Sequence, residues 1–272
     1  MATLGQIIFY TMVTLIFVVA ALIILILALA FSNASSEVMS SNTTPIANLG
    51  GDELLSCYLN TANPQTSVRQ LSVIWEKKDT KGLVYKYVNG APDLTGQDSQ
   101  FKERTQLFST GLPTGNASLL LRNVKSTDEG EYTCTIVSSD GGGKVNIHLR
   151  TAAFTAPTFT LSNGTLGAEA SRWFPKPNVM WSDFDGKVLQ GSTILTENSA
   201  GIFSVASTLH PVNTSATYSC TIGNDLVTAV SKVTTTDSGV QGSTYFTYNA
   251  ASSLWASSYL SMISILCIYY LS

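Results

Sequence analysis

Cysteine is the residue type in this sequence whose chemistry would shape the fold most directly. Four cysteines are present, at positions 57, 134, 220 and 267. Their number alone leaves the pairing open. Cys267 lies inside an apolar run near the C-terminus, which indicates a thiol that is embedded in a membrane or removed with a processed segment. The other three cysteines leave room for one disulfide and one unpaired thiol.

Catalytic and metal-binding chemistry has little support in the sequence. The chain has two histidines, His148 and His210, and it has no H-E-x-x-H, C-x-x-C or G-x-S-x-G motif. A general base needs a placed partner and a metal site needs a cluster of ligands. We therefore expect no enzyme activity, no metal, no cofactor and no small-molecule substrate. A net charge of -3 without a Lys/Arg cluster also argues against nucleic-acid binding.

The residues before Cys134 identify the element that positions it. Residues 128–134 have the sequence DEGEYTC, the D-x-G-x-Y-x-C pattern of the E to F corner and F strand in a variable-type immunoglobulin domain. Trp75 lies between Cys57 and Cys134, which completes the Cys, Trp, Cys order of that fold. The pattern predicts a structural disulfide between Cys57 and Cys134 that stabilises the domain by about 4 to 5 kcal/mol through loop closure.

Two further expectations concern the same corner. Tyr132 occupies the tyrosine-corner position, so its ring is expected in the core near Trp75. An Arg at the D strand of a variable domain commonly pairs with the Asp of this corner, which predicts an ion pair between Arg104 and Asp128. The alternative is two unconnected surface charges, and an exposed pair would contribute under about 1 kcal/mol.

Length and strand pattern indicate two such domains. At 272 residues the chain exceeds one immunoglobulin domain of roughly 100 residues. From residue 46 onward, short runs with period-two alternation are bounded by Gly, Asn, Pro and Asp, as in sandwich strands. We predict an all-β fold of two tandem immunoglobulin-like sandwiches, variable-type over residues 45–151 and constant-type over residues 152–236, with an apolar segment at each end. Residues 151–157 are expected to act as the linker.

The first domain has a recognisable order of strands. Cys57 and Trp75 occupy inward-facing positions of strands B and C. Residues 83–88 predict strand C', and the segment that follows, up to residue 101, leaves room for the C'' strand of a variable-type domain. Residues 138–143 are expected to form a hairpin loop before strand G. Its three glycines are interpreted as turn residues with positive φ rather than as a phosphate cradle, since no Walker spacing follows.

The second domain repeats the pattern with one omission. Trp181 takes the place of Trp75, and Tyr218 and Cys220 repeat the Y-x-C of strand F. The partner cysteine should lie near Ala168, where there is none, and the loss of such a bridge costs about 2 to 5 kcal/mol. We expect Cys220 to be an unpaired, buried thiol that packs as a small hydrophobic residue. The alternatives are an intermolecular disulfide and a sequencing or splicing irregularity near residue 168.

The N-terminal segment predicts export. Residues 7–31 carry no charge and are long enough to span a bilayer. The A-x-A motif at residues 28–30 favours a cleaved signal peptide over residues 1–30, although the absence of Lys and Arg before it leaves an uncleaved anchor as the alternative. Residues 31–44 are rich in Ser, Asn and Thr and are expected to be a flexible lead-in.

The C-terminal segment predicts attachment to the plasma membrane. Residues 237–253 are polar and stalk-like, and residues 254–272 form a hydrophobic membrane-anchor segment. Small residues at positions 249–251 followed by a Ser-rich spacer resemble a glycolipid-anchor signal. A type I single-pass helix is the alternative, which the absence of a Lys/Arg stop disfavours. Both place the two domains at the extracellular face.

Five N-x-[ST] sequons also suit a surface glycoprotein with exposed loops. They begin at Asn33, Asn42, Asn116, Asn163 and Asn213.

Several stretches of the sequence resemble a known family. They are residues 1–7 (MATLGQI), residues 115–119 (GNASL), residues 172–175 (RWFP), and residues 218–220 (YSC) followed by Asn224 and Asp225. With these stretches the chain resembles the butyrophilin-related family of T-cell costimulatory and coinhibitory ligands, and within it the V-set domain-containing T-cell activation inhibitors. The resemblance implies a cell-surface ligand that binds a T-cell surface receptor and reduces activation, proliferation and cytokine production.

If the resemblance holds, binding is expected on the outward C, C', F and G face of the first domain. Strand pleating points residues on either side of Trp75 and Cys134 away from the core, and aromatic residues often anchor interfaces. The candidates are Ile74, Glu76, Tyr85, Tyr87, Thr133, Thr135, Val137, Ser139 and Lys144. The competing hypothesis is a homophilic cell-adhesion molecule on the same fold, because fold does not fix function.

Overall fold

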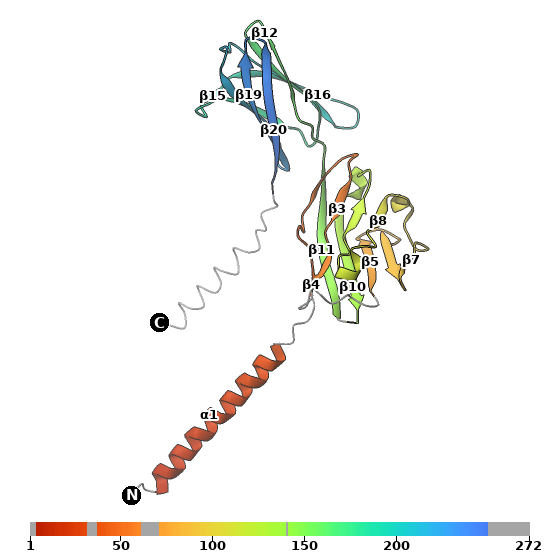
Figure 1. Cartoon of the computed structure of the whole chain (residues 1–272), viewed down its shortest axis with the longest axis vertical. Coiled ribbons are helices and arrows are strands. Elements are labelled where there is room, and N and C mark those ends of the chain that lie inside the picture. The colour runs from red at the N-terminus through yellow and green to blue at the C-terminus, as the bar shows by residue number, and fades with distance from the viewer. Residues whose placement is uncertain (1–3, 32–36, 61–70, 140, 250–272) are drawn as a thin grey trace.

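An apolar helix precedes two β-sandwiches in the computed structural model, which describes residues 4–31, 37–60, 71–139 and 141–249 (Figure 1). The helix is α1 (Leu4–Phe31), and its stretch Phe9–Ile26 is apolar on every side, unburied and long enough to cross a membrane. A signal sequence has the same properties near an N-terminus. The expected cleavage after residue 30 stays a prediction, and the expected anchor at residues 254–272, with Cys267, lies outside the described residues.

The first sandwich confirms the variable-type fold. Its larger sheet has the strand order β2, β11, β10, β5, β6, β7, its smaller sheet has the order β3, β9, β8, and β1 and β4 form a separate pair. The strands are β1 (Glu37–Met39), β2 (Ile46–Asn48), β3 (Glu53–Leu55), β4 (Tyr58–Asn60), β5 (Ser72–Lys77), β6 (Tyr85–Val88), β7 (Ala91–Pro92), β8 (Thr105–Leu107), β9 (Leu119–Leu121), β10 (Gly130–Ser138) and β11 (Gly141–Ala152). Short 3-10 turns occupy Ser99–Phe101, Leu112–Thr114 and Ser126–Asp128.

The predicted disulfide and tryptophan form the centre of this sandwich. Cys57 is bonded to Cys134, and Trp75 lies fully buried opposite Cys134 in the β5–β10 register. The Trp75 indole donates a hydrogen bond of 3.0 Å to the carbonyl of Ala117, whose own N–H donates to the carbonyl of Cys57. Closing a loop with a sequence separation of 77 corresponds to about 4.5 kcal/mol in the chain-entropy model. The disulfide therefore supplies a large share of the stability of this domain.

Two local expectations for this domain are wrong. The lead-in is not wholly free, because β1 lies within residues 31–44, pairs with β4 and buries Val38. The hairpin loop after β10 is also shorter than residues 138–143, since β11 begins at Gly141 and only that glycine of the three has a positive φ. Gly142 instead allows close strand approach, because a Cβ there would lie 2.3 Å from the carbonyl oxygen of Ile136.

The second sandwich has a four-stranded and a five-stranded sheet. The orders are β12, β13, β17, β16 and β15, β14, β18, β19, β20. The strands are β12 (Thr158–Ser162), β13 (Thr165–Trp173), β14 (Asn178–Asp183), β15 (Val188–Leu189), β16 (Gly191–Glu197), β17 (Phe203–Leu209), β18 (Thr217–Gly223), β19 (Val227–Thr236) and β20 (Gly239–Tyr248). Trp181 and Tyr218 lie in its core, as expected from the sequence.

The structure shows which position lacks its cysteine. Cys220 is a free, buried thiol opposite Trp181, just as Cys134 lies opposite Trp75 in the first domain. The Trp181 indole donates a hydrogen bond of 2.9 Å to Ser207, and Ser207 pairs with Ala168. In the first domain the Trp75 indole contacts Ala117 in the same way, and Ala117 is hydrogen-bonded to Cys57. Ala168 therefore occupies the position that corresponds to Cys57. Ala168 is itself fully buried.

The predicted stalk is wrong for residues 239–248. These residues form β20, which pairs with β19 along its whole length. Phe246, and Tyr248 at the exposed end of the strand, contact the ring of Phe154, with ring centroids 5.1 and 5.9 Å away. The apolar contacts and the ladder of backbone hydrogen bonds stabilise a strand whose Ser, Thr and Gly content resembles that of a stalk.

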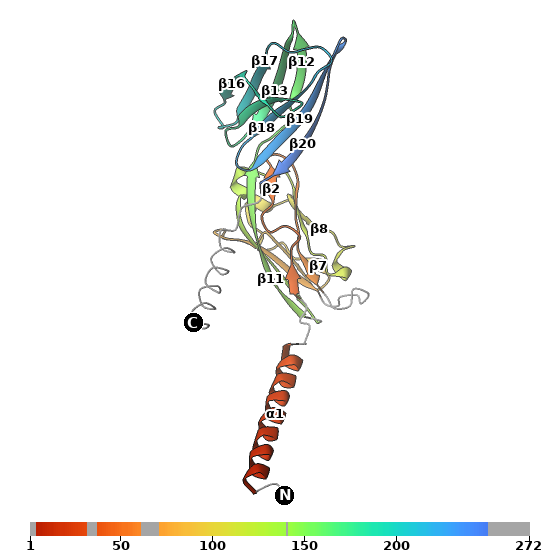
Figure 2. The same cartoon turned by 90° about the vertical axis from the view of Figure 1, so that its left-hand side faces the viewer.

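The segment between the domains is packed rather than free. Ala153 and Phe154, inside the expected linker, are buried, and the Asn48 amide exchanges hydrogen bonds with both backbone groups of Phe154. Arg172 of the second domain donates a hydrogen bond of 2.6 Å to the carbonyl of Leu49 in the first. Figure 2 shows the end of β20 beside β2 at this junction. The chain therefore holds the two domains at a defined elbow.

Candidate functional site

The outward face of the larger sheet in the first domain collects most of the residues that the sequence predicts for binding. The strand registers align Ile74 with Thr135 and Lys144, and they align Glu76 with Thr133. These side chains alternate with Trp75, Cys134 and Ile136, which are fully buried, so they point away from the core. The face is therefore built by the same alternation that positions the disulfide.

The centre of this face is apolar or hydroxyl-bearing, and its margin is charged. Val137 is 57% exposed, and Ile74 and Thr135 are half-buried. Lys144 is exposed at one end of their row, and Lys86 stands at the other end through its pairing with Ile74. An apolar centre with a polar margin is the usual arrangement of a protein-binding surface.

Polar contacts order the margin of the face. The Thr133 hydroxyl donates to the side-chain oxygen of Asn146 at 3.0 Å, and the His148 ring lies 2.6 Å from the Glu131 carboxylate. Lys86 forms an ion pair with Asp93 at 2.8 Å. Hydrogen bonds from Lys86 and then from Thr95 lower the pKa of Asp93 from 3.8 to about 2. Asp93 therefore stays charged throughout the physiological pH range.

Two of the predicted binding residues do not belong to this face. Tyr85 is only 6% exposed, and Tyr87 packs against the core. The β5–β6 register places Tyr85 opposite Trp75 and Tyr87 opposite Val73, and directly opposed residues point to the same side of a sheet. Both tyrosines consequently face inward. The residue that β6 presents outward is Lys86, which the sequence would have indicated only once the register was known.

Ser139 lies exposed in the β10–β11 hairpin, at the rim where the sequence placed it. Its neighbour at position 140 lies outside the described residues.

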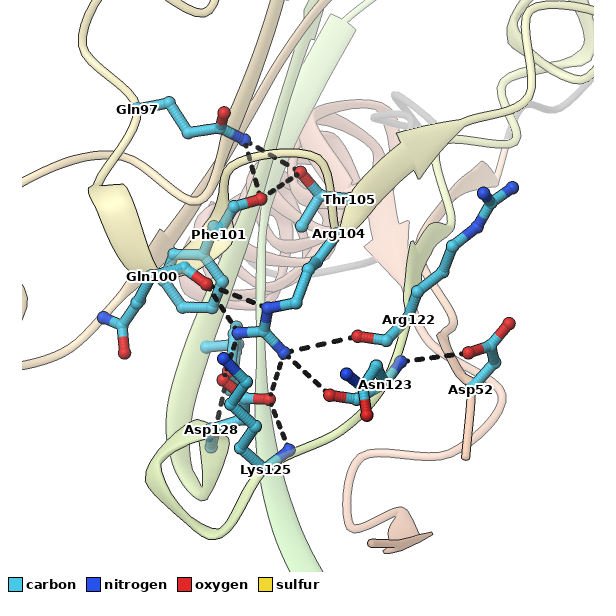
Figure 3. A network of polar contacts seen from close by, with 11 residues as sticks. Asp52, Gln97, Gln100, Phe101, Arg104, Thr105, Arg122, Asn123, Lys125 and Asp128 are labelled. Carbon is cyan, nitrogen blue, oxygen red and sulfur yellow. Dashed lines mark hydrogen bonds and ion pairs between the residues drawn. The ribbon is translucent and has the colours of Figure 1, made fainter. Parts of the chain in front are cut away.

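The ion pair between Arg104 and Asp128 lies at the turn that precedes β10 of this sheet (Figure 3). The guanidinium donates two hydrogen bonds of 2.8 Å to the two carboxylate oxygens of Asp128, whose side chain is fully buried, while that of Arg104 is 11% exposed. Arg104 also donates to the carbonyls of Gln100, Arg122 and Asn123. The predicted pair is thus present, and it is buried rather than exposed.

The tyrosine corner completes this network. The Tyr132 hydroxyl donates a hydrogen bond of 2.7 Å to the backbone carbonyl of Asp128, and a carboxylate oxygen of Asp128 accepts from the N–H of Lys125. Burial, followed by the charge of Asp128, raises the pKa of Tyr132 well above its usual value. The hydrogen bond that Arg104 donates to Asp128 raises the pKa of Arg104. The hydrogen bonds of Asp128 to Arg104, Lys125 and Tyr132 therefore fix the loop that leads into β10.

The four sequons within the described residues are exposed. Asn42 precedes β2, Asn163 forms the turn between β12 and β13, and Asn116 and Asn213 lie in loops; Asn33 is outside the described residues. Glycosylation at each of these sites stays a prediction.

The described residues contain no group of three or more His, Cys, Asp or Glu side chains that could hold a metal ion. His210 contacts the Thr165 hydroxyl and the carbonyl of Gly164 in a surface turn. Burial raises the pKa of the Cys220 thiol to about 12, which leaves it un-ionised and unreactive near neutral pH. The chemistry that this surface supports is non-covalent protein contact.

Comparison with known proteins agrees with the two sandwiches. The sequence model of the immunoglobulin V-set domain matches residues 40–150, and that of the butyrophilin subfamily 3 member A2-like Ig-C domain matches residues 163–232. The chain is 34% identical to human V-set domain-containing T-cell activation inhibitor 1 over 96% of its own length and 95% of that protein. The chain belongs to this family of T-cell activation inhibitors.

Two further comparisons give similar identities. The rat V-set domain-containing T-cell activation inhibitor 1 is 37% identical, covering 89% of this chain and 87% of that protein. The crystal structure of the human B7-H4 IgV-like domain is 33% identical, with a TM-score of 0.37, and covers 42% of this chain and 95% of that one. As a V-set and Ig-C member of a ligand family, the chain is not an enzyme.

Proposed function

We propose that this T-cell activation inhibitor acts at the cell surface by binding a T-cell surface receptor with the outward face of its first domain. The observation that supports the proposal most is the row Lys86, Ile74, Thr135 and Lys144, in which two lysines flank an apolar and hydroxyl-bearing centre. A receptor surface with an apolar centre and acidic margin would complement this row.

The supporting geometry is that of a rigid platform. The disulfide, Trp75 and the Arg104–Asp128 pair hold the strands from behind, so the outward side chains need little ordering when a partner binds. Residues 254–272 would hold the chain in or on the plasma membrane, as a glycolipid attachment signal or a single-pass helix.

The proposal is tested with Thr135→Arg, which places a long charged side chain at the centre of the face without entering the core. Leu54→Arg is the matched control, because Leu54 is 49% exposed on β3 in the other sheet. The ectodomain variants are coated on plates with stimulated T cells. We expect Thr135→Arg to weaken receptor binding and suppression of proliferation by about tenfold or more, a change of at least about 1.4 kcal/mol. Leu54→Arg should retain both.

Equal suppression by Thr135→Arg and the unsubstituted ectodomain would rule out this face. Coated beads provide a second measurement, because a homophilic adhesion molecule would aggregate them. Aggregation without any effect on stimulated T cells would favour adhesion over a receptor ligand.

A further inference from the structure

A groove lies between the two domains at the elbow. It has a volume of about 360 Å³, and its walls come from both sandwiches. The first domain contributes Asn42, Thr44, Ile46 and Glu53, and the second contributes Tyr248 and Asn249. Any group that fills this groove therefore contacts both domains at once.

The groove has the chemical character of a carbohydrate site. Tyr248 is 55% exposed at the end of β20, and its ring is held by an edge contact with Phe154. An aromatic ring offers an apolar face that the C–H groups of a sugar ring can cover. Glu53 makes no hydrogen bond or ion pair through its carboxylate within the described part of the chain, and burial raises its pKa. Its oxygens are acceptors to which none of the other described residues lining the groove donates a hydrogen bond.

An attachment point for a sugar lies on the same wall. Asn42 begins the sequon Asn42-Thr43-Thr44, and both Asn42 and Thr44 line the groove. The Asn42 side-chain oxygen accepts a hydrogen bond of 3.0 Å from the N–H of Thr44, and Asn42 is exposed. This contact occupies the oxygen and leaves the amide nitrogen Nδ2 available for modification.

We propose that an N-linked glycan on Asn42 occupies this groove, with its innermost N-acetylglucosamine against Tyr248 and Glu53. In the attachment step Nδ2 forms a bond to C1 of the first sugar and loses a proton. The bond between C1 and the diphosphate of a lipid-linked oligosaccharide donor of the secretory pathway breaks in the same step. The sugar then replaces water between the domains and braces the elbow.

The wall on the second domain is fixed in place to receive the sugar. The backbone carbonyl of Asn249 accepts a hydrogen bond of 2.9 Å from Arg150, which lies on β11 opposite Ile46. The Asn249 amide donates to the carbonyls of Asn224 and Asp225. The side-chain oxygen of Asn249 stays available as a further acceptor for sugar hydroxyl groups.

The test compares the full chain with Asn42→Gln, both expressed in mammalian cells, by glycopeptide mass spectrometry and hydroxyl-radical footprinting. Tyr245 is an internal reference, because it is 60% exposed on β20 but points away from the groove. We expect a hexosamine-bearing Asn42 peptide and about threefold or more slower oxidation of Tyr248 in the unsubstituted chain, since groups seated in pockets lose most of their exposure. Oxidation of Tyr245 should be equal in the two proteins.

Two controls separate this glycan from general shielding. Asn213→Gln removes an exposed sequon in the second domain and should leave Tyr248 oxidation unchanged. Enzymatic trimming to one N-acetylglucosamine should retain the protection of Tyr248, because the innermost sugar is the one in contact. An unmodified Asn42, equal Tyr248 oxidation in Asn42→Gln, or loss of protection on trimming would each overturn the proposal.

Discussion

Ala168→Cys should restore the disulfide that the second domain lacks. Ala168 and Cys220 are both fully buried in one core, and the contacts from Trp181 through Ser207 place Ala168 where Cys57 lies in the first domain. In the first domain the corresponding Cα atoms are 6.5 Å apart, within the range that a disulfide spans. Closing the loop between residues 168 and 220 corresponds to about 4 kcal/mol in the chain-entropy model.

The assay combines peptide mapping with calorimetry of the oxidised protein. A peptide linked through position 168 and Cys220 is expected, and one of the two unfolding transitions should move to higher temperature by several degrees per kcal/mol. The double variant Ala168→Cys with Cys220→Ala carries the same substitution without a partner, so it should show no gain. The reasoning about equivalent positions would be refuted if the two thiols stayed unlinked, or if the linked protein were no more stable than the double variant.

Three other outcomes follow from the buried and charged groups. Arg104→Ala leaves the Asp128 carboxylate buried without its partner and should destabilise the first domain by about 3 to 5 kcal/mol in denaturant unfolding. Lys86→Ala removes the partner of the more exposed Asp93 and should lower the unfolding midpoint far less, so equal effects would contradict the difference in burial. Cys220 should resist alkylation in the native protein at pH 8 and react only after unfolding, because burial raises its pKa to about 12; rapid native labelling would count against a buried thiol. The pKa of Asp93 is lowered from 3.8 to about 2 on folding, so its contribution to stability is present above about pH 4 and is lost as the pH falls toward 2. Asp93→Asn should make the melting temperature of the first domain depend less on pH over that interval. An unchanged dependence on pH would exclude Asp93 as a source of the acid sensitivity.

The sequence predicted best what depends on residue types at fixed places along the chain. Cys57, Trp75 and Cys134 define a fold by their order, and Arg104 and Asp128 are chemical complements at known positions of that fold. The burial of this ion pair was not predictable, because it depends on Gln100 and the Arg122 backbone closing around the guanidinium. The solvent exposure of Arg104 and Asp128 is set by the neighbouring backbone in the folded domain, not by the types of the two residues.

Features that depend on pairing between strands were predicted poorly. The orientation of Tyr85 follows from its register with Trp75, which a slip of one residue would reverse. Residues 239–248 have a composition typical of both a stalk and an exposed strand. These residues form a strand rather than a stalk because they pair with β19 along its whole length and because Phe246 contacts Phe154. Both partners, β19 and Phe154, lie outside residues 239–248.

The packed elbow has a mechanical consequence for the proposed contact between two cells. Because Arg172 and Asn48 tie the domains together through backbone groups, the second domain serves as a lever arm of constant tilt. If residues 254–272 anchor the chain as proposed, the packed elbow sets the height of the first domain above the membrane and the direction in which that domain faces. When the distance between the two cells matches this height, many of these molecules can contact a receptor at the same time. At other distances, few of them can do so.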